Sequence, residues 1–369
     1  MSDTDTDALA ILKQSILDAG PADAVLDPVV LKRILTAANF EEPDQVPIWD
    51  FIDSWPIYQE YAPGETDPVR ATAAVFNGLG IDMCRSVYMP VGLGEECGNM
   101  EAQEHGRTHW AGRPITSLAE LHAFEIPPPT ELQGWEWAKW NLDARQVFAP
   151  RTLYVPCDGI GFHAAYGMMG IEMFSYALID AFDDAARLVE GYFRHALDRA
   201  QAFAQTSVCP LFMYGDDIAF KGRAMFSPSV MHKLFYPYLE ELCHVLGQSG
   251  IKVIFHTDGY VMDIAADLVA CGIAGLNPLE PLAGNDIPEL KRLYGDRLIL
   301  VGGIDCSQIL PLGTVDDVRA AVRDLLDTCG RGGGLFIGSS SEIVPVTPVE
   351  NIHAFYDACR EFGQYPLDL

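Results

Sequence analysis

Basic side chains are scarce in this sequence, which narrows the choice of partners. Its 369 residues include 24 lysines and arginines against 52 aspartates and glutamates, giving a formal net charge of −28. Nucleic acids and anionic membranes bind proteins through basic patches, because lysines and arginines release the counterions of the partner. We therefore expect a small-molecule substrate, and neither a nucleic acid nor a membrane as partner.

Long apolar runs and paired cysteines are also lacking. No apolar run approaches the roughly 20 residues that span a bilayer. The N-terminal segment MSDTDTDALA has neither the positive region nor the apolar stretch of a signal peptide. The nine cysteines are an odd number without a CxxC pair, which is typical of reduced thiols in a cytosolic protein. We therefore expect a cytoplasmic protein.

Motifs of several familiar enzyme classes do not occur. The sequence has no GxSxG, no P-loop and no HExxH motif. Their absence disfavours serine hydrolases, phosphate-loop NTPases and zincin peptidases. No GxGxxG follows the first predicted strand, so we do not expect a dinucleotide-binding half.

What the sequence does contain is a series of short apolar runs separated by helical patterns. Hydrophobic residues make up 49% of the chain, which is enough for a packed core. The runs are almost wholly apolar rather than alternating, as in parallel strands that are covered on both faces. We predict strands at residues 46–50, 81–88, 152–156, 210–214, 251–256, 273–277, 298–302 and 334–338.

These runs and the patterns between them predict the fold class. Eight strands alternating with helices predict an α/β fold, a (β/α)8 TIM-like barrel. An open doubly wound sheet is the alternative. The predicted helices cover residues 172–206, split near 180–184, and residues 227–248, 260–271, 286–294 and 315–329.

Two segments fall outside this alternation. Residues 1–24 have little periodicity, and we expect a flexible or helical leader before a single barrel domain at residues 25–369. Residues 94–115, after the second strand, predict a hairpin excursion from the barrel. A short helix follows the excursion, with Thr116 or Ser117 as its N-cap.

Polar side chains follow each predicted strand. The carboxyl ends of barrel strands carry the chemistry, so these residues are the candidates for a site. Many carboxylates that point into one cavity must be offset by a metal, a cation or bound protons. The candidates are Asp50, Arg85, Tyr88, Cys157, Asp158, His163, Tyr214, Asp216, Asp217, His256, Asp258, Asn277, Glu280, Asp305, Cys306, Ser339, Ser340, Ser341 and Glu342.

The sharpest local signal is the segment VIFHTDG at residues 253–259. A strand ends at His256, and Asp258 lies two positions further on, so both can face the same side in extended backbone. Such a pair is half of a site for a cation of the size of zinc. A histidine hydrogen-bonded to an aspartate, without a metal, is the alternative. The remaining ligands would come from Ser341, Glu342, Glu280, Asp217 or Cys157.

Several ordered segments resemble the uroporphyrinogen decarboxylase superfamily, which also holds zinc-dependent methyltransferases that serve corrinoid proteins. The C-terminal half carries most of the likeness, and YGDDIAFKGRAMF and GIKVIFHTDGYV are among its motifs. The matching segments are residues 39–50, 113–129, 214–242, 250–261, 275–305 and 313–363. The resemblance covers most of residues 30–363. It implies a TIM-like barrel, often dimeric, with a deep cleft at the carboxyl ends of the strands.

The sequence departs from two patterns of the superfamily, and each departure disfavours one of its known reactions. Its porphyrinogen decarboxylases carry an arginine-rich segment after the first strand, whereas residues 47–61 contain no arginine to hold substrate carboxylates. The branch that acts on coenzyme M holds zinc with a His-x-Cys pair and a later cysteine. Here these positions are His256, Asp258 and Ser341, so both thiolates are missing. A harder site of nitrogen and oxygen ligands suits a zinc ion that polarises an oxygen.

The resemblance thus implies a methyltransferase, with zinc as cofactor, that moves a methyl group from a small O- or N-methylated substrate to a corrinoid. A separate partner protein would carry the corrinoid, because a DxHxxG corrinoid-binding pattern is absent. A decarboxylase of a small acid or of a porphyrinogen, and a non-catalytic barrel that binds a small ligand, are the alternatives.

The expected roles divide the candidates into three groups. The catalytic residues are His256, Asp217, Glu280 and Tyr214. The metal ligands are His256, Asp258, Ser341 and Glu342. The substrate-binding residues are Asp50, Tyr88, Asp158, His163 and Asn277.

Overall fold

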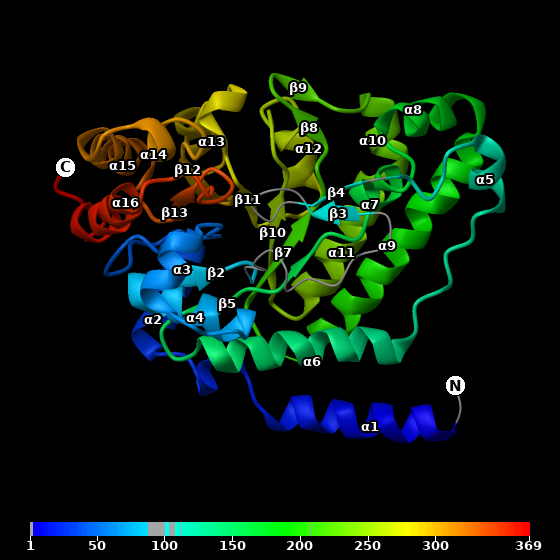
Figure 1. Ribbon diagram of the computed structural model, residues 1–369, viewed down its shortest axis with the longest axis horizontal. Helices are drawn as coiled ribbons and strands as arrows, with labels where there is room; N and C mark the ends of the chain where they lie inside the picture. Colours follow the sequence, from blue (N-terminus) through cyan, green and yellow to red (C-terminus); the bar gives the residue numbers. More distant parts are fainter. Residues whose placement is uncertain (1–2, 88–99, 103–107, 111, 207) are drawn as a thin grey trace.

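Parallel strands form the centre of the molecule in the computed structural model, which describes residues 3–87, 100–102, 108–110, 112–206 and 208–369 (Figure 1). The central strands are β1 (Trp49–Asp50), β2 (Met83–Cys84), β5 (Leu153–Tyr154), β6 (Cys157–Asp158), β7 (Leu211–Gly215), β10 (Lys252–His256), β11 (Gly275–Asn277), β12 (Ile299–Ile304) and β13 (Leu335–Ser339). Each of the eight predicted strand segments overlaps one of them.

The order of these strands is that of a barrel. One sheet runs β1-β2-β5 and the other runs β6-β7-β10-β11-β12-β13, with every pair parallel. Only two residues separate β5 from β6, so the two strands are ends of one strand interrupted at Pro156. An isolated parallel bridge between Ile48 and Ile337 brings β13 beside β1. The predicted α/β barrel is confirmed, although this last junction is a bridge rather than a ladder.

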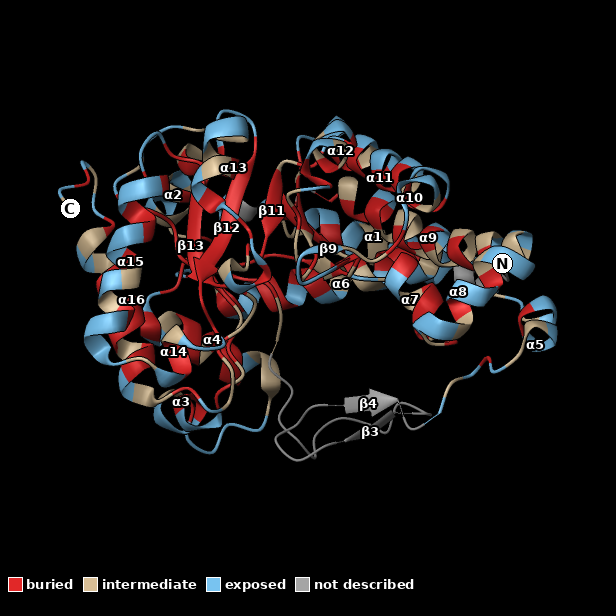
Figure 2. Ribbon diagram, turned by 90° about the horizontal axis from the view of Figure 1, so that it is seen from above, coloured by how far each residue is buried: buried red, intermediate tan, exposed pale blue. Residues whose placement is uncertain are grey.

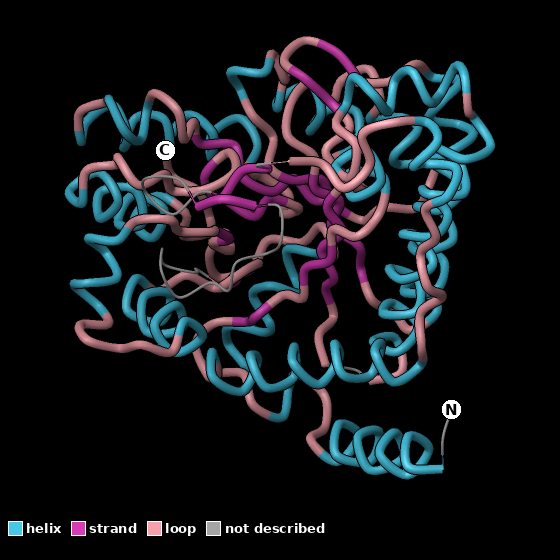
Figure 3. Tube along the Cα trace, turned by 45° about the vertical axis from the view of Figure 1, so that its right-hand side comes forward, coloured by secondary structure: helices cyan, strands magenta, loops and turns pink. Residues whose placement is uncertain are grey.

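Helices surround the strands, as the tube in Figure 3 shows. They are α1 (Asp3–Asp18), η1 (Ala22–Ala24), α2 (Pro28–Ala38), α3 (Trp55–Tyr61), α4 (Pro68–Leu79), α5 (Leu118–Ala123), α6 (Glu131–Phe148), α7 (Phe162–Gly167), α8 (Ile171–Asp180), α9 (Phe182–Ala204), α10 (Pro228–Leu234), α11 (Tyr236–Gln248), α12 (Ala265–Ala270), η2 (Pro281–Ala283), α13 (Ile287–Tyr294), α14 (Ile309–Leu312), α15 (Val315–Cys329) and α16 (Val349–Phe362). The predicted split between α8 and α9 is confirmed at Ala181, and acidic Asp183 and Asp184 fill the first turn of α9, where the helix dipole favours them.

Two helices are shorter than the sequence pattern predicts. The helix predicted over residues 227–248 is broken at Phe235. Pro237 explains the break, because in a continuous helix its ring would clash with the carbonyl four residues earlier and it donates no backbone hydrogen bond. The helix predicted over residues 260–271 begins only at Ala265, since the side chain of Asn285 accepts the N–H of Val261 and holds that segment in a turn.

The leader is helical from Asp3 to Asp18 and lies along α6, as Figure 1 shows at the foot of the molecule. It buries Leu9 and Ile16. The ammonium of Lys13 pairs with Glu131 and lies 5.2 Å from the centre of the Trp135 ring. These contacts attach α1 to the helical layer.

The hairpin predicted after the second strand is confirmed. β3 (Met100–Ala102) and β4 (Thr108–Trp110) pair antiparallel. A second hairpin, β8 (Ala219–Phe220) with β9 (Arg223–Ala224), follows β7. The short helix α5 is capped by the side chain of Ser117, which accepts the N–H of Glu120.

The apolar strands are buried on both faces, as their continuous hydrophobic runs predict. Every residue of β12 and β13 is buried, and Figure 2 shows buried strands within helices whose outer faces are exposed. Among the residues that the structure describes, no helix combines the length and the apolarity needed to cross a membrane. Because the strands are parallel, their carboxyl ends open on one side, the mouth of the barrel.

Candidate metal and active site

Three side chains from two neighbouring strands converge at the mouth of the barrel. Asp217 follows β7, and His256 and Asp258 lie at and just beyond the end of β10. β7 and β10 pair with His256 opposite Gly215. One ligating atom from each of the three side chains lies within 4.8 Å of the others. We call Asp217, His256 and Asp258 the His256 cluster.

The ring of His256 is held in one orientation. Its Nδ1 lies 2.7 Å from Oδ1 of Asn277, at the end of β11. An amide oxygen only accepts, so the proton of a neutral imidazole sits on Nδ1 and the lone pair sits on Nε2. Nε2 lies 3.7 Å from Oδ1 of Asp258. Burial and the charge of Arg85 lower the pKa of His256, which keeps this lone pair free to bind a cation.

A tight turn carries Asp258 back toward the cluster. Gly259 has a φ of +98°, and a Cβ there would lie 2.8 Å from the backbone of Ala219, so the turn requires glycine. The N–H of Gly259 donates to the Glu280 carboxylate at 2.7 Å, and that of Asp258 donates to Asp217 at 3.2 Å. Glu280, a predicted catalytic residue, therefore holds the turn that positions Asp258.

The Asp258 side chain is 49% exposed, but one of its carboxylate oxygens lacks a hydrogen-bond partner among the described residues. Its Oδ1 is buried and makes no hydrogen bond to the described residues. Burial raises the pKa of Asp258, as does the neighbouring charge of Asp217. A buried carboxylate oxygen without a partner is costly, so a cation or a proton at this place would stabilise it.

Asp217 stays ionised because of its neighbours. Burial alone would raise its pKa, but the hydrogen bond from His163 and the charges of both nearby histidines outweigh burial and lower the pKa to about 2. Nδ1 of His163 lies 3.4 Å from Asp217. The same contact raises the pKa of His163, whose ring stacks on Tyr166 with centres 4.9 Å apart. His163, predicted to bind substrate, thus borders the cluster as a basic group.

Asp216, next to Asp217 in the sequence, has a structural role at the start of α7. Its carboxylate accepts the N–H groups of Phe162 and His163 at the start of α7. It also accepts the hydroxyl of Tyr214 at 3.0 Å. Burial raises its pKa to about 7. Asp216 therefore fixes the helix that carries His163, while Asp217 faces the cluster.

The donor set of the His256 cluster fits a zinc ion. Zinc in catalytic sites takes three protein ligands from nitrogen and oxygen donors and keeps a fourth position open. Bonds of about 2.0–2.1 Å in a tetrahedron separate ligand atoms by about 3.4 Å, close to the 3.7 Å between His256 and Asp258. The partnerless Oδ1 of Asp258 is the further observation that calls for a cation. None of the eight cysteines among the described residues belongs to the cluster.

Two other predicted ligands lie beside the cluster. The charge of Glu342 raises the pKa of Asp258, which places Glu342 nearby, but it is not a member of the cluster. The hydroxyl of Ser341 donates to Glu342 at 3.3 Å. The carbonyl of Ser341 accepts from Arg85 at 2.8 Å.

Tyr214 and Asp158 lie apart from the cluster, on the helical side of the strands. Tyr214 stands opposite Phe255 in the register, and its ring contacts Phe193 of α9. Asp158 stands opposite Tyr214 and lies 3.3 Å from Arg199 of α9. Since neither side chain shares the face of His256, we place neither in the site.

Asp50 is also remote from the cluster. Its carboxylate is buried and accepts the hydroxyls of Ser339 at 2.6 Å and of Tyr356, on α16, at 2.9 Å. These bonds hold β1, β13 and α16 together, so the geometry does not favour the predicted contact of Asp50 with substrate. Tyr88, another predicted substrate-binding residue, lies outside the described residues.

The sequence pattern missed two roles. Asn277 was expected to bind substrate, but it orients His256. Arg85, at the end of β2, was noted without a role, although it is only 9% exposed and its charge acts on His256 and Asp258. Its place just past a strand is the signal that could have marked it.

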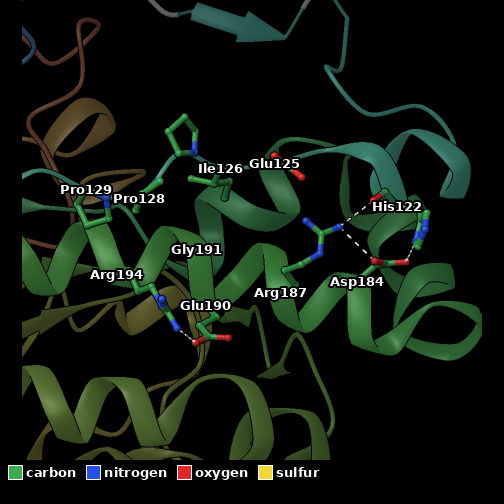
Figure 4. Close-up of a pocket in the computed structure, with 11 residues that line it drawn as sticks. His122, Glu125, Ile126, Pro128, Pro129, Asp184, Arg187, Glu190, Gly191 and Arg194 are labelled. Atoms are coloured by element: carbon green, nitrogen blue, oxygen red, sulfur yellow. Dashed lines mark hydrogen bonds and ion pairs between the residues drawn. The ribbon is translucent and has the colours of Figure 1, made fainter.

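A groove on the surface lies away from this site, on the outer face of α9 beside residues 122–129 (Figure 4). Apart from Glu125, the charged side chains that line it pair with one another. His122 and Arg187 both contact Asp184 at about 3 Å, and Arg194 pairs with Glu190. Because these charges are already matched, we do not place the active site there.

Comparison with known proteins agrees with this geometry. The sequence profile described as uroporphyrinogen decarboxylase (URO-D) matches residues 113–362. The methylcobamide:CoM methyltransferase MtaA of Methanosarcina barkeri is 30% identical over 172 residues, 46% of this chain and 49% of that protein. A uroporphyrinogen decarboxylase of Coxiella burnetii is 28% identical over 145 residues, 38% of each chain. The matched parts thus span about half, or less, of these curated relatives.

A solved structure supports the fold over a greater length. The methyltransferase from Methanosarcina mazei superposes with a TM-score of 0.70 at 21% identity, covering 90% of this chain and 98% of that one. Its architecture is therefore that of the barrel described above. Since the family profile covers well over half of the sequence, the chain belongs to the uroporphyrinogen decarboxylase (URO-D) family.

Proposed function

We propose that this protein is a zinc-dependent methyltransferase that removes a methyl group from a small O- or N-methylated substrate and passes it to a corrinoid on a separate partner protein. The observation that carries the proposal is the His256 cluster, with its partnerless Asp258 oxygen at the mouth of the barrel. The likeness to a methylcobamide:CoM methyltransferase supports the methyl-transfer class.

The chain would hold the metal through Nε2 of His256 and one oxygen each of Asp217 and Asp258. When bound, zinc supplies a Lewis acid that stabilises negative charge on the group that loses its methyl. Soft thiolates are the ligands that hold zinc for binding a thiol, whereas this cluster offers nitrogen and oxygen. The donor set therefore favours an oxygen or nitrogen leaving group.

Neighbouring residues prepare the site for this reaction. Asn277 fixes the imidazole of His256, and Glu280 fixes the turn that carries Asp258. His163 donates through Nδ1 to Asp217, and its raised pKa favours a proton on Nε2 as well. A protonated His163 can give that proton to the departing oxygen or nitrogen as a general acid.

Metal analysis of the purified protein tests this proposal. We expect about one zinc per chain in the wild type and none in His256→Ala. His244→Ala, on the surface of α11, is the matched control and keeps the metal. Methyl transfer from methoxy compounds to added cob(I)alamin, followed by absorbance, must depend on the same zinc. Activity in metal-free protein, or zinc retained by His256→Ala, contradicts the proposal.

A decarboxylase of a small acid is the second candidate, favoured by one observation. Burial raises the pKa of both Asp258 and Glu280, and a protonated acid is what a decarboxylase needs to quench a carbanion. If the protein is a decarboxylase, we expect the zinc-free protein to release CO2 from a small carboxylic acid. It also expects Glu280→Gln to abolish that release, whereas loss of activity on zinc removal excludes it.

A further inference from the structure

Arg85 is a buried cation at the mouth of the barrel without a counter-ion among the described residues. It follows β2 and is 9% exposed. Its Nη2 donates to the neutral carbonyl of Ser341 at 2.8 Å, and its guanidinium lies 4.9 Å from the centre of the Phe51 ring. Its Nε is buried and has no hydrogen-bond partner in the part of the chain that the structure describes.

Two partly buried arginines of this chain pair with carboxylates. Arg33 pairs with Asp44 and Asp82, both at 2.7 Å, and Arg199 pairs with Asp158. Arg85 makes no ion pair with any described carboxylate, because none comes within 4.0 Å of it. A buried guanidinium without an anion is costly. Arg145 of α6, 2% exposed, is held among the described residues by the carbonyls of Gly20 and Val208 alone, but Arg85 differs because it lies at the mouth of the barrel, where an anion from outside the chain can reach it.

The acids near Arg85 do not fill this need. The charge of Arg85 lowers the pKa of both His256 and Asp258, so the guanidinium lies near the His256 cluster. Neither carboxylate of the cluster comes within 4.0 Å of the guanidinium, so neither forms an ion pair with it. The cation of Arg85 then remains for a negative group of the substrate, lying on the same mouth of the barrel.

We infer that Arg85 binds an oxyanion of the substrate, a carboxylate or a sulfonate, while the methylated end of the same molecule lies at the His256 cluster. The inference rests on the proposed function. A guanidinium is a fixed fork of donors that matches such oxyanions. The substrate class is therefore a small methylated acid, and neutral compounds such as methanol are excluded.

Binding of matched probes tests the inference. Methoxyacetate and 2-methoxyethanesulfonate carry a methyl ether and an oxyanion, whereas 2-methoxyacetamide is a neutral isostere of the first. Ligand-observed NMR titration gives a Kd for each with zinc-free protein. We expect at least one anion to bind at least tenfold more tightly than the amide, and the tighter anion identifies the oxyanion type.

Variants assign this preference to Arg85. Arg85→Gln loses it and Arg85→Lys keeps part of it, whereas Arg297→Gln, at an exposed arginine, keeps all of it. Circular dichroism and zinc content show that the variants fold. Equal affinities for the three probes in the wild type, or a preference that survives Arg85→Gln, overturns the inference.

These experiments distinguish failure of the proposed function from failure of the oxyanion site at Arg85. His256→Ala removes the metal but leaves Arg85, so it keeps the preference for the anion. A wild type that holds no zinc overturns the proposed function, while the probe titration still reports on Arg85. An Arg85→Gln protein with its zinc and an unchanged anion preference overturns the oxyanion site alone.

Discussion

The side-chain oxygen of Asn277 lies 2.7 Å from Nδ1 of His256 and so fixes the tautomer and the orientation of the imidazole. Hydrogen bonds of this kind to metal-binding histidines raise the basicity of the ligand, and their loss typically costs 10–100-fold in metal affinity. The two residues are opposite each other in the register of β10 and β11. The sheet itself therefore sets the geometry of the candidate metal site.

The first prediction concerns this hydrogen bond. Asn277→Ala lowers zinc affinity about 10–100-fold, because the ring loses its partner and can rotate. Asn277→Asp retains an acceptor and most of the affinity. Competition with a chromophoric chelator measures the change, and Asn141→Ala, at a buried asparagine of α6, serves as the control. Unchanged affinity in Asn277→Ala means that Asn277 does not position His256.

The second prediction concerns Asp258, whose buried Oδ1 has no partner among the described residues. Zinc at 100 times its Kd raises the free energy of unfolding by about 2.7 kcal/mol if it binds only the native state. We expect this gain in the wild type and none in Asp258→Asn. The metal-free variant is no less stable than the wild type, because it removes a carboxylate in need of a cation.

Urea unfolding with and without zinc measures both effects of Asp258→Asn. Asp263→Asn, at an exposed position of the same connection, is the control and keeps the zinc-dependent gain. A zinc-dependent gain of wild-type size in Asp258→Asn excludes Asp258 as a ligand. A large loss of metal-free stability instead assigns Asp258 a structural role.

The sequence predicted the strands well because barrel strands leave a clear pattern. Each is a short, continuously apolar run, and each was placed within a few residues of its observed position. Most of the described polar candidates, His256 and Asp258 among them, lie at or just beyond the ends of the observed strands. His256 and Asp258 were paired on the same side from their spacing alone, and the structure brings them within 3.7 Å.

The sequence could not show which face of a strand each candidate occupies. Alternate side chains of a strand point to opposite faces, and a run that is apolar throughout does not mark which face is the lumen. Tyr214 stands opposite Phe255, and Gly215 stands opposite His256. Tyr214 therefore faces the helices, one position away from the face of the site. The roles of Asn277 and Arg85 depend on contacts across strands, which no local pattern encodes.

The third prediction concerns the junction that completes the barrel. Gly338 of β13 lies so close to β1 that a Cβ there would come 1.9 Å from the carbonyl oxygen of Trp49. Gly338→Ala must push the two strands apart, and overpacking of this kind typically costs about 1–3 kcal/mol. We therefore expect a lower free energy of unfolding, measured in urea.

Gly247→Ala is the matched control for this substitution. Gly247 lies on an exposed position of α11, and nothing stands within 4 Å of its added Cβ. Gly247 lies in the last turn of α11, where alanine is favoured over glycine by at most about 0.5–1 kcal/mol, so this variant is at least as stable as the wild type. A Gly338→Ala protein as stable as the wild type shows that β1 and β13 can separate without cost.

The last prediction concerns the pH dependence of stability that comes from Asp50. Burial raises the pKa of Asp50 to about 6, although hydrogen bonds from Ser339 and Tyr356 oppose the rise. The unfolded value is near 3.8, so between about pH 4 and pH 6 the native state binds a proton that the unfolded chain has released. Stability attributable to Asp50 therefore falls as the pH rises through this window.

The contribution of Asp50 to the pH dependence of the free energy of unfolding is large enough to measure, although other groups also titrate. A raised pKa of this size corresponds to about 3 kcal/mol between pH 4 and pH 7. Asp50→Asn cannot ionise, so its free energy of unfolding falls less steeply over this range than that of the wild type, whatever its absolute stability. Urea midpoints at four pH values, with Asp296→Asn as an exposed control, measure the difference in slope. Parallel curves for Asp50→Asn and the wild type show that the Asp50 carboxyl keeps an ordinary pKa in the folded protein, and that its four hydrogen bonds fully offset its burial.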